Sequence, residues 1–108
     1  MANTIDIISK EWFDKVNGNS YFAGTITVDY KTETEETFLM PFQYGYGSQH
    51  EQEAKGILTQ FNKISSNWNQ NLYSYCKENN IKFCSSIQTE CKQKELKEIE
   101  NEYNRNLN

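Results

Sequence analysis

The sequence has few of the residues that mark catalytic, metal-bound or membrane-spanning proteins. Its 108 residues include one histidine, one proline and five glycines, and no apolar run is long enough to cross a bilayer. The cysteines, Cys76, Cys84 and Cys91, lack the CxxC spacing of a zinc or redox site. No Walker loop and no GxGxxG motif occurs. We therefore expect a cytosolic protein with free thiols, no cofactor, no metal, no membrane contact and no enzymatic activity.

The charge balance bears on nucleic-acid binding. Fifteen acidic residues outnumber eleven basic ones, which gives a net charge of -4. Affinity for nucleic acid rests largely on Lys and Arg that neutralise phosphates, so this balance argues mildly against such a partner. Apolar residues are 36% of the chain, but 14% are aromatic, and each aromatic side chain buries about 150–250 Å². A chain of this length predicts a single domain, residues 1–108.

Alternating apolar residues predict two strands near the N-terminus. The first covers about residues 3–8, and residues 9–16 either extend it or form one helical turn. The second strand, residues 21–30, has the clearest alternation of apolar and polar side chains in the chain. The side chains expected on its apolar face are Phe22, Ile26, Val28 and Tyr30, with Gly24 between them.

A polar loop and a return strand follow. Residues 31–36 predict a hairpin loop, and residues 37–42 predict a strand. Pro41 has no backbone donor, so this strand ends there or lies on an edge of the sheet. The side chains expected on one side of the strand are Phe38, Met40 and Phe42.

Three helices and a fourth strand are predicted in the rest of the chain. Ser48 and Glu51 form an S-x-x-E capping box at the start of the first helix. A second helix is expected at about residues 66–78, a short strand at 81–87 and a last helix at about 90–106. The apolar stripes of the three helices are Ala54, Ile57, Leu58 and Phe61; Trp68, Leu72, Tyr75 and Cys76; and Leu96, Ile99 and Tyr103.

The element order β-β-β-α-α-β-α predicts an α+β fold. We expect a small antiparallel sheet of three to four strands, packed against two or three helices that cover one face. The last helix carries a narrow apolar stripe among charged residues. It docks on the domain, or it is peripheral and forms a homo-oligomer or contacts a partner.

The segment from residue 42 to residue 48 is the first candidate binding site. Gly45 and Gly47 allow backbone amides to turn toward a ligand, and the helix N-terminus just downstream favours anions such as phosphate. Tyr44 and Tyr46 are suited to stack on a base or on a partner's side chain. The alternative is a strand-to-helix turn with aromatic packing. The candidate residues here are Tyr44, Gly45, Tyr46, Gly47 and Ser48.

Residues 12–21 form the second candidate. Trp and Tyr are enriched at interaction hot spots, although they also form ordinary cores. Asp14 follows two aromatic residues, and it either caps the Asn17-Gly18 turn or contacts a ligand. The candidate binding residues in this segment are Trp12, Asp14, Asn17, Asn19 and Tyr21.

His50 is the only histidine, and it is a candidate for proton transfer because histidine titrates near neutrality. The alternative is a solvated residue of the helix. We assign no catalytic residue, and we keep His50 among the candidate ligand or partner contacts.

Two segments resemble motifs of a group of small phage and prophage proteins of unassigned function. They are Trp-Phe-Asp-Lys-Val-Asn-Gly-Asn-Ser-Tyr, residues 12–21, and Pro-Phe-Gln-Tyr-Gly-Tyr-Gly, residues 41–47. The resemblance covers about residues 8–61. In that family a histidine often follows the tyrosine of the first motif, whereas Phe22 stands there in this chain. The resemblance implies a phage origin and the host bacterial cytosol, but no activity.

Small acidic phage accessory proteins often act as stoichiometric inhibitors of bacterial defences, including CRISPR–Cas. The resemblance therefore implies a counter-defence protein that binds a bacterial host protein, such as a defence effector. A sponge or sensor that binds a nucleotide signal at the Tyr44–Ser48 loop is one alternative, and a nucleic-acid-binding module is another.

Overall fold

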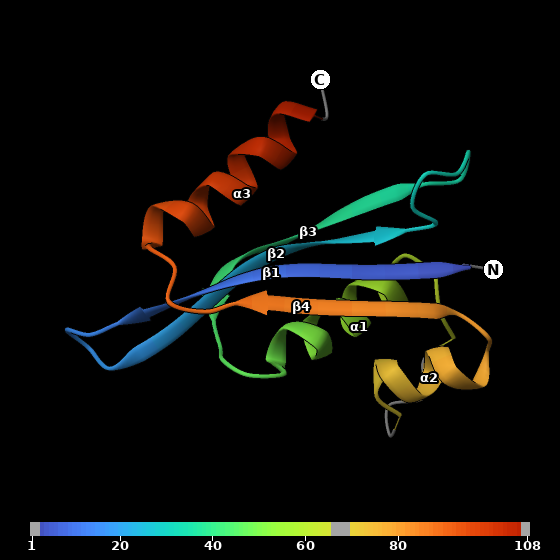
Figure 1. The fold of residues 1–108 in the computed structure, drawn as a ribbon, viewed down its shortest axis with the longest axis horizontal. Helices are drawn as coiled ribbons and strands as arrows, with labels where there is room; N and C mark the ends of the chain where they lie inside the picture. Colours follow the sequence, from blue (N-terminus) through green and yellow to red (C-terminus); the bar gives the residue numbers. More distant parts are fainter. Residues whose placement is uncertain (1–2, 66–69, 107–108) are drawn as a thin grey trace.

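The computed structural model describes residues 3–65 and 70–106. In this part of the chain, one four-stranded sheet is combined with three helices (Figure 1). The α+β class and the element order predicted from the sequence are confirmed. The elements are β1 (Thr4–Asp14), β2 (Asn19–Val28), β3 (Glu36–Tyr44), α1 (Gln49–Gln60), α2 (Leu72–Glu78), β4 (Lys82–Gln88) and α3 (Gln93–Asn106).

The sheet has the strand order β3-β2-β1-β4. β2 pairs antiparallel with both β1 and β3, but β4 pairs parallel with β1. The sheet is therefore mixed, where the sequence predicted an antiparallel one. The reason is the long connection through α1 and α2, which carries the chain from the end of β3 back to the start of β1. A helical crossover of this kind is how parallel neighbours are joined.

β1 is a single long strand. It pairs with β2 without interruption from Ile5 opposite Val28 to Asp14 opposite Asn19. Residues 9–14 therefore extend the first strand, which was one of the two predicted alternatives, and they form no helical turn. The β1–β2 hairpin extends past the end of β4, whose pairing with β1 stops at Lys10 opposite Gln88 (Figure 1).

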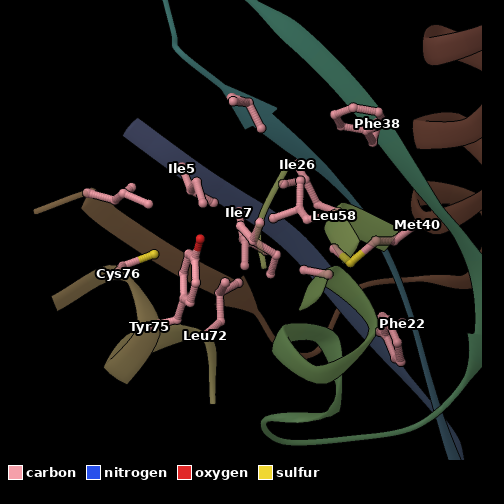
Figure 2. Close-up of a cluster of buried hydrophobic side chains, with 14 residues drawn as sticks. Ile5, Ile7, Phe22, Ile26, Phe38, Met40, Leu58, Leu72, Tyr75 and Cys76 are labelled. Carbon is pink, nitrogen blue, oxygen red and sulfur yellow. The ribbon is translucent and has the colours of Figure 1, made fainter. Parts of the chain in front are cut away.

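The main core lies between one face of the sheet and the helices α1 and α2 (Figure 2). Most of the predicted apolar face of β2 and of the stripes of α1 and α2 meets there, although Trp68 lies outside the described residues. Tyr30 and Phe61 were also predicted on these apolar faces, but they lie beyond the ends of β2 and α1 and are exposed, so this part of the prediction is wrong. Burial of each large apolar side chain stabilises the fold by about 1.5–3 kcal/mol. The buried members are Ile5, Ile7, Phe22, Ile26, Val28, Phe38, Met40, Ala54, Leu58, Ile64, Leu72, Tyr75, Cys76 and Ile81.

A second, smaller core lies on the opposite face, under α3. Ala23, Cys91 and Leu96 are buried there. Tyr103 also donates a hydrogen bond from its hydroxyl to the Thr37 carbonyl at 3.3 Å. Helices therefore cover both faces of the sheet, which corrects the prediction of a single covered face. The side chains that pack against this second core are Trp12, Tyr21, Phe42 and Ile99.

A register shift between β2 and β3 explains why Phe42 belongs to the second core. Gly24 pairs with Met40, but Phe22 pairs with Gln43, so β3 has one extra residue between these pairs. A bulge of this kind turns the following side chains to the other face. Phe42 therefore faces α3, whereas the sequence predicted it on the side of Phe38 and Met40.

The helix starts differ from the predictions. Ser48 is the N-cap of α1, but its side chain makes no capping hydrogen bond, so the predicted S-x-x-E capping box is wrong. α2 begins at Leu72, and the Asn71 side chain caps it by accepting from the Ser74 amide at 2.8 Å. No described helix is long and apolar enough to span a membrane.

Candidate functional site

The two candidate segments of the sequence meet at one end of the sheet, which we call the hairpin end (residues 12–21 and 42–48). β1 ends, β2 begins and β3 ends there, and Tyr21 lies between Trp12 and Tyr44 in the strand register. The Gly45 amide also donates to the Ser20 carbonyl at 2.9 Å. Segments that are far apart in the sequence therefore lie side by side at this end of the sheet.

A row of aromatic rings crosses the hairpin end on the face toward α3. The rings of Trp12 and Tyr21 are stacked at 5.5 Å between centroids, and those of Tyr21 and Phe42 at 5.2 Å. Tyr44 meets Tyr21 edge-on at 5.9 Å. Such pairs each contribute about 0.5–1.5 kcal/mol beyond their buried area. Trp12 and Tyr21 are half-buried in this row, whereas Tyr44 is its exposed end.

Asp14 organises the turn of the hairpin. Its carboxylate accepts from the Val16 amide at 3.0 Å and from the Asn17 side chain at 2.8 Å. Gly18 donates its amide to the Asp14 carbonyl at 2.7 Å and has a positive φ of 72°, which glycine adopts without strain. The hydrogen bond from the Asn17 side chain is the main reason why the pKa of Asp14 lies below its ordinary value. Asp14 therefore caps the turn, and Asn19 pairs with it in the strand ladder.

Two exposed apolar residues of the hairpin were missed by the sequence analysis. Val16 is 91% exposed at the turn, and Phe13 is 50% exposed on the face opposite Trp12. The alternation along β1 is the signal that identifies Phe13, because it turns neighbouring side chains to opposite faces. A hollow of about 760 Å³ lies beside them, and its lining includes Trp12, Lys15 and Lys92.

The Tyr44–Ser48 loop exposes two aromatic rings. Tyr44 and Tyr46 are both exposed, and Gly45 has no space for a side chain because a Cβ would lie 2.6 Å from the Phe22 ring. The Tyr46 amide donates to the Gln49 side-chain oxygen at 3.1 Å, and the Gly45 amide is also bonded within the protein. These two amides are therefore not directed at a ligand.

Glu51 lies in the first turn of α1, and its negative charge opposes an anion at the positive end of the helix. Its carboxylate accepts a hydrogen bond from the Ser85 hydroxyl of β4 at 2.8 Å. This contact joins the start of α1 to the edge of the sheet.

His50 is a buried residue between α1 and the sheet. It is only 3% exposed, so the alternative of a solvated helix residue is wrong. Its Nδ1 lies 2.9 Å from the Ser9 hydroxyl of β1, and Ser9 is itself 2% exposed. Ser9 was missed, although a serine in line with Ile5 and Ile7 on an apolar face is a recognisable signal. Ser9 and His50 therefore form a buried hydrogen-bonded contact between β1 and α1.

The environment of His50 favours the neutral ring. Burial lowers the pKa of His50 below its ordinary value of 6.5, and the negative charges of Glu51 and Glu11 oppose this shift less strongly. The Nε2 atom lies 3.9 Å from the Glu51 carboxylate, which is too far for a hydrogen bond.

The thiols differ in their surroundings. Cys84 is exposed, whereas Cys76 and Cys91 are buried, and all three are free. Burial raises the pKa of Cys76 to about 11 and also raises that of Cys91. Among the described residues, no group of three or more His, Cys, Asp or Glu side chains is placed to hold a metal ion.

Comparison of the chain with family models, with curated proteins and with solved structures finds no match in any of the three. The geometry identifies the hairpin end as the candidate site. It combines exposed apolar side chains with a backbone that Asp14 and the aromatic row hold in place.

Proposed function

We propose that this chain acts by stoichiometric binding of a bacterial host protein, and that the hairpin end is its contact surface. The observation that supports this proposal is the gathering of exposed apolar side chains at one projecting end of the sheet. Apolar and aromatic side chains that are exposed together commonly mark protein interaction sites. These side chains are Phe13, Val16, Tyr44 and Tyr46.

The rigidity of the hairpin end favours binding. Asp14 caps the turn, and the stacked rings of Trp12, Tyr21 and Phe42 join the three strands behind it. A surface that is already ordered loses less conformational entropy when a partner binds. Binding of a partner to Val16 and Phe13 therefore costs little conformational entropy.

The proposed target class is a bacterial defence effector, such as a component of a CRISPR–Cas system. This part of the proposal depends on the resemblance of residues 12–21 and 41–47 to motifs of small phage proteins. An inhibitor of this class needs no catalytic group, only a surface that occupies its target. The proposed site of action is the host bacterial cytosol.

Affinity capture from defence-expressing bacteria tests the proposal. Tagged wild-type protein is expected to retain one host protein in about equal molar amount. A variant with Phe13→Ser and Val16→Asp is expected to lose more than about tenfold in affinity, since truncation of a hot-spot residue costs about 2 kcal/mol or more. Tyr30→Ser is the matched control, because Tyr30 is exposed at the other end of the sheet.

The proposal fails if wild-type protein captures no host protein and leaves phage growth unchanged on every defended host. Equal capture by wild type and by the Phe13/Val16 variant would instead exclude the hairpin end as the contact surface. A Tyr30→Ser protein that binds like wild type confirms that the loss is local.

Binding of a nucleotide signal is the second candidate function. The exposed rings of Tyr44 and Tyr46 favour it. A hollow of about 480 Å³ lies at the starts of α1 and α2; Ser48 lines it, whereas neither tyrosine does, and the carboxylate of Glu51 in its wall opposes an anion. That volume is within the usual range for small-molecule sites. Calorimetry with cyclic and linear nucleotides is the test, and Tyr46→Ser is expected to weaken any binding. No heat with any nucleotide would exclude this candidate.

A further inference from the structure

We propose that His50 is a proton-operated latch, and that uptake of one proton by its ring releases the start of α1 and the Tyr44–Ser48 loop from the sheet. This inference concerns the fold itself and holds whether or not the proposed binding function is correct. It begins from the position of the ring. His50 is the second residue of α1, and its side chain is buried against Ser9 of β1.

The contact between His50 and Ser9 depends on the protonation of the ring. The negative charge of Glu51 near Nε2 favours the tautomer that carries its proton on Nε2. Nδ1 then accepts the hydrogen bond from the Ser9 hydroxyl, across 2.9 Å. Protonation adds a hydrogen to Nδ1, so Nδ1 becomes a donor and the Ser9 hydroxyl must reverse to accept. The Ser9 proton then needs another acceptor in a buried place.

A charged ring is unfavourable at this position for two further reasons. The ring is enclosed, and burial of a charge is costly unless the charge is well paired. His50 also lies in the first turn of α1, where the positive end of the helix dipole repels a cation. The charged groups that attract the proton are Glu51 of α1 and Glu11 of β1. The partners of Ser9 in β2 and β4 are Gly24 and Ile87, which do not titrate.

Hydrogen bonds between Tyr46 and Gln49 explain why the Tyr44–Ser48 loop should move when the start of α1 moves. Gln49 begins α1 and accepts the Tyr46 amide with its side chain, and its own amide donates to the Tyr46 carbonyl at 3.3 Å. His50 is the next residue. A first turn that moves away from Ser9 therefore removes the support of the loop that carries Tyr46.

The direction of the pH dependence follows from the lowered pKa of His50. The released state binds the proton with the ordinary pKa of 6.5, and the docked state binds it less readily. The docked state is therefore fully stable above about pH 6.5 and loses stability as the pH falls below that value. The loss levels off below the pKa of the docked ring. The ordinary pKa of the Asp carboxyls is far below this window.

Two measurements on the full chain test the latch. His50 is the only histidine, so its Cε1 proton gives a single NMR titration, and the expected midpoint lies below 6.5. Hydrogen-exchange protection factors are compared at about pH 7.5 and 5.5, after correction for intrinsic rates. Protection of the Tyr46 and Gln52 amides should be lower at pH 5.5 than at pH 7.5, by at most about tenfold, because pH 5.5 lies only one unit below the ordinary pKa of 6.5. Protection of the Ile26 amide should not change.

The variant His50→Asn keeps a hydrogen-bonding partner for Ser9 but does not titrate. Its protection factors at Tyr46 and Gln52 should not change between the two pH values. Ser9→Ala removes the contact at any pH, so its protection at pH 7.5 should already be lower than that of wild type.

A His50 midpoint at or above 6.5 overturns the proposal. An equal pH response in wild type and His50→Asn does so as well, as does wild-type protection in Ser9→Ala at pH 7.5. If neither variant folds, the wild-type titration and the wild-type protection factors at the two pH values together decide the matter: unchanged protection at Tyr46 and Gln52 overturns the proposal.

Discussion

Gly24 has the most crowded surroundings of the glycines in this chain. A Cβ at that position would lie 2.4 Å from the Ile8 carbonyl oxygen and 2.7 Å from the Ser9 hydroxyl. The obstacle is partly backbone, which cannot move aside as a flexible side chain can. The side chain that occupies the space above Gly24 is therefore that of Ser9, which also forms the hydrogen bond with His50 of α1.

We predict that Gly24→Ala lowers the free energy of unfolding by about 1–3 kcal/mol, since an added methyl group overpacks the core. Gly56→Ala is the matched control. Gly56 lies in the interior of α1 with no atom within 4 Å of an added Cβ, so alanine should stabilise the helix by about 0.5–1 kcal/mol. Urea denaturation monitored by circular dichroism measures both. Two variants of equal stability would contradict the packing argument.

The last helix, α3, packs on strands that are far from it in the sequence. It contacts the sheet through a narrow stripe, of which Leu96 is fully buried and Ile99 is partly buried. The surface that receives it is built from β1, β2 and β3, since Trp12, Tyr21 and Phe42 come from one strand each. The docking of α3 therefore depends on the register shift that turns Phe42 toward it.

We predict that Leu96→Ala lowers the free energy of unfolding by about 2–5 kcal/mol, because it leaves a cavity between α3 and the sheet. Lys97→Ala changes an exposed neighbour and should alter stability by less than about 0.5 kcal/mol. Urea denaturation of both proteins measures the difference. A Leu96→Ala protein as stable as Lys97→Ala would show that α3 contributes little to the fold in solution.

The molecule as a whole has two unequal cores on the two faces of one sheet. The larger core is enclosed by α1 and α2, and the smaller one is covered by α3 alone. Each core holds one buried cysteine, Cys76 in the larger and Cys91 in the smaller. The third cysteine, Cys84, is exposed on β4. The reactivity of the three thiols therefore reports separately on the larger core, the smaller core and the surface.

We predict that a thiol reagent modifies Cys84 rapidly in the folded protein, and that Cys91 follows much more slowly. Cys76 should react last, because it becomes accessible only when the larger core opens, whereas detachment of α3 exposes Cys91. Mass spectrometry of peptides from a labelling time course measures the order. In a Cys84→Ser background the rapid phase should disappear. Equal rates for Cys91 and Cys76 would show that the two cores open together.

The elements themselves were largely predictable from local patterns. Alternation identified Phe22, Ile26 and Val28 of β2, and the helical stripes identified most of the side chains of α1 and α2 that face the main core. Tyr30 and Phe61 continue the same patterns but lie beyond the ends of β2 and α1, where they are exposed. These signals are reliable because they depend on residues within two turns or a few strand positions of each other. The capping of the Asn17-Gly18 turn by Asp14 belongs to the same group, since the contact is local.

The sequence by itself therefore determined the α+β class, the element order and the two segments that form the hairpin end. Only the tertiary structure decided that β4 runs parallel to β1, that Phe42 faces α3, and that His50 is buried against Ser9. Each of these depends on which distant residues become neighbours, and one shift in register reverses the face of every following side chain. No local periodicity contains that information, because the competing arrangements share the same short-range pattern.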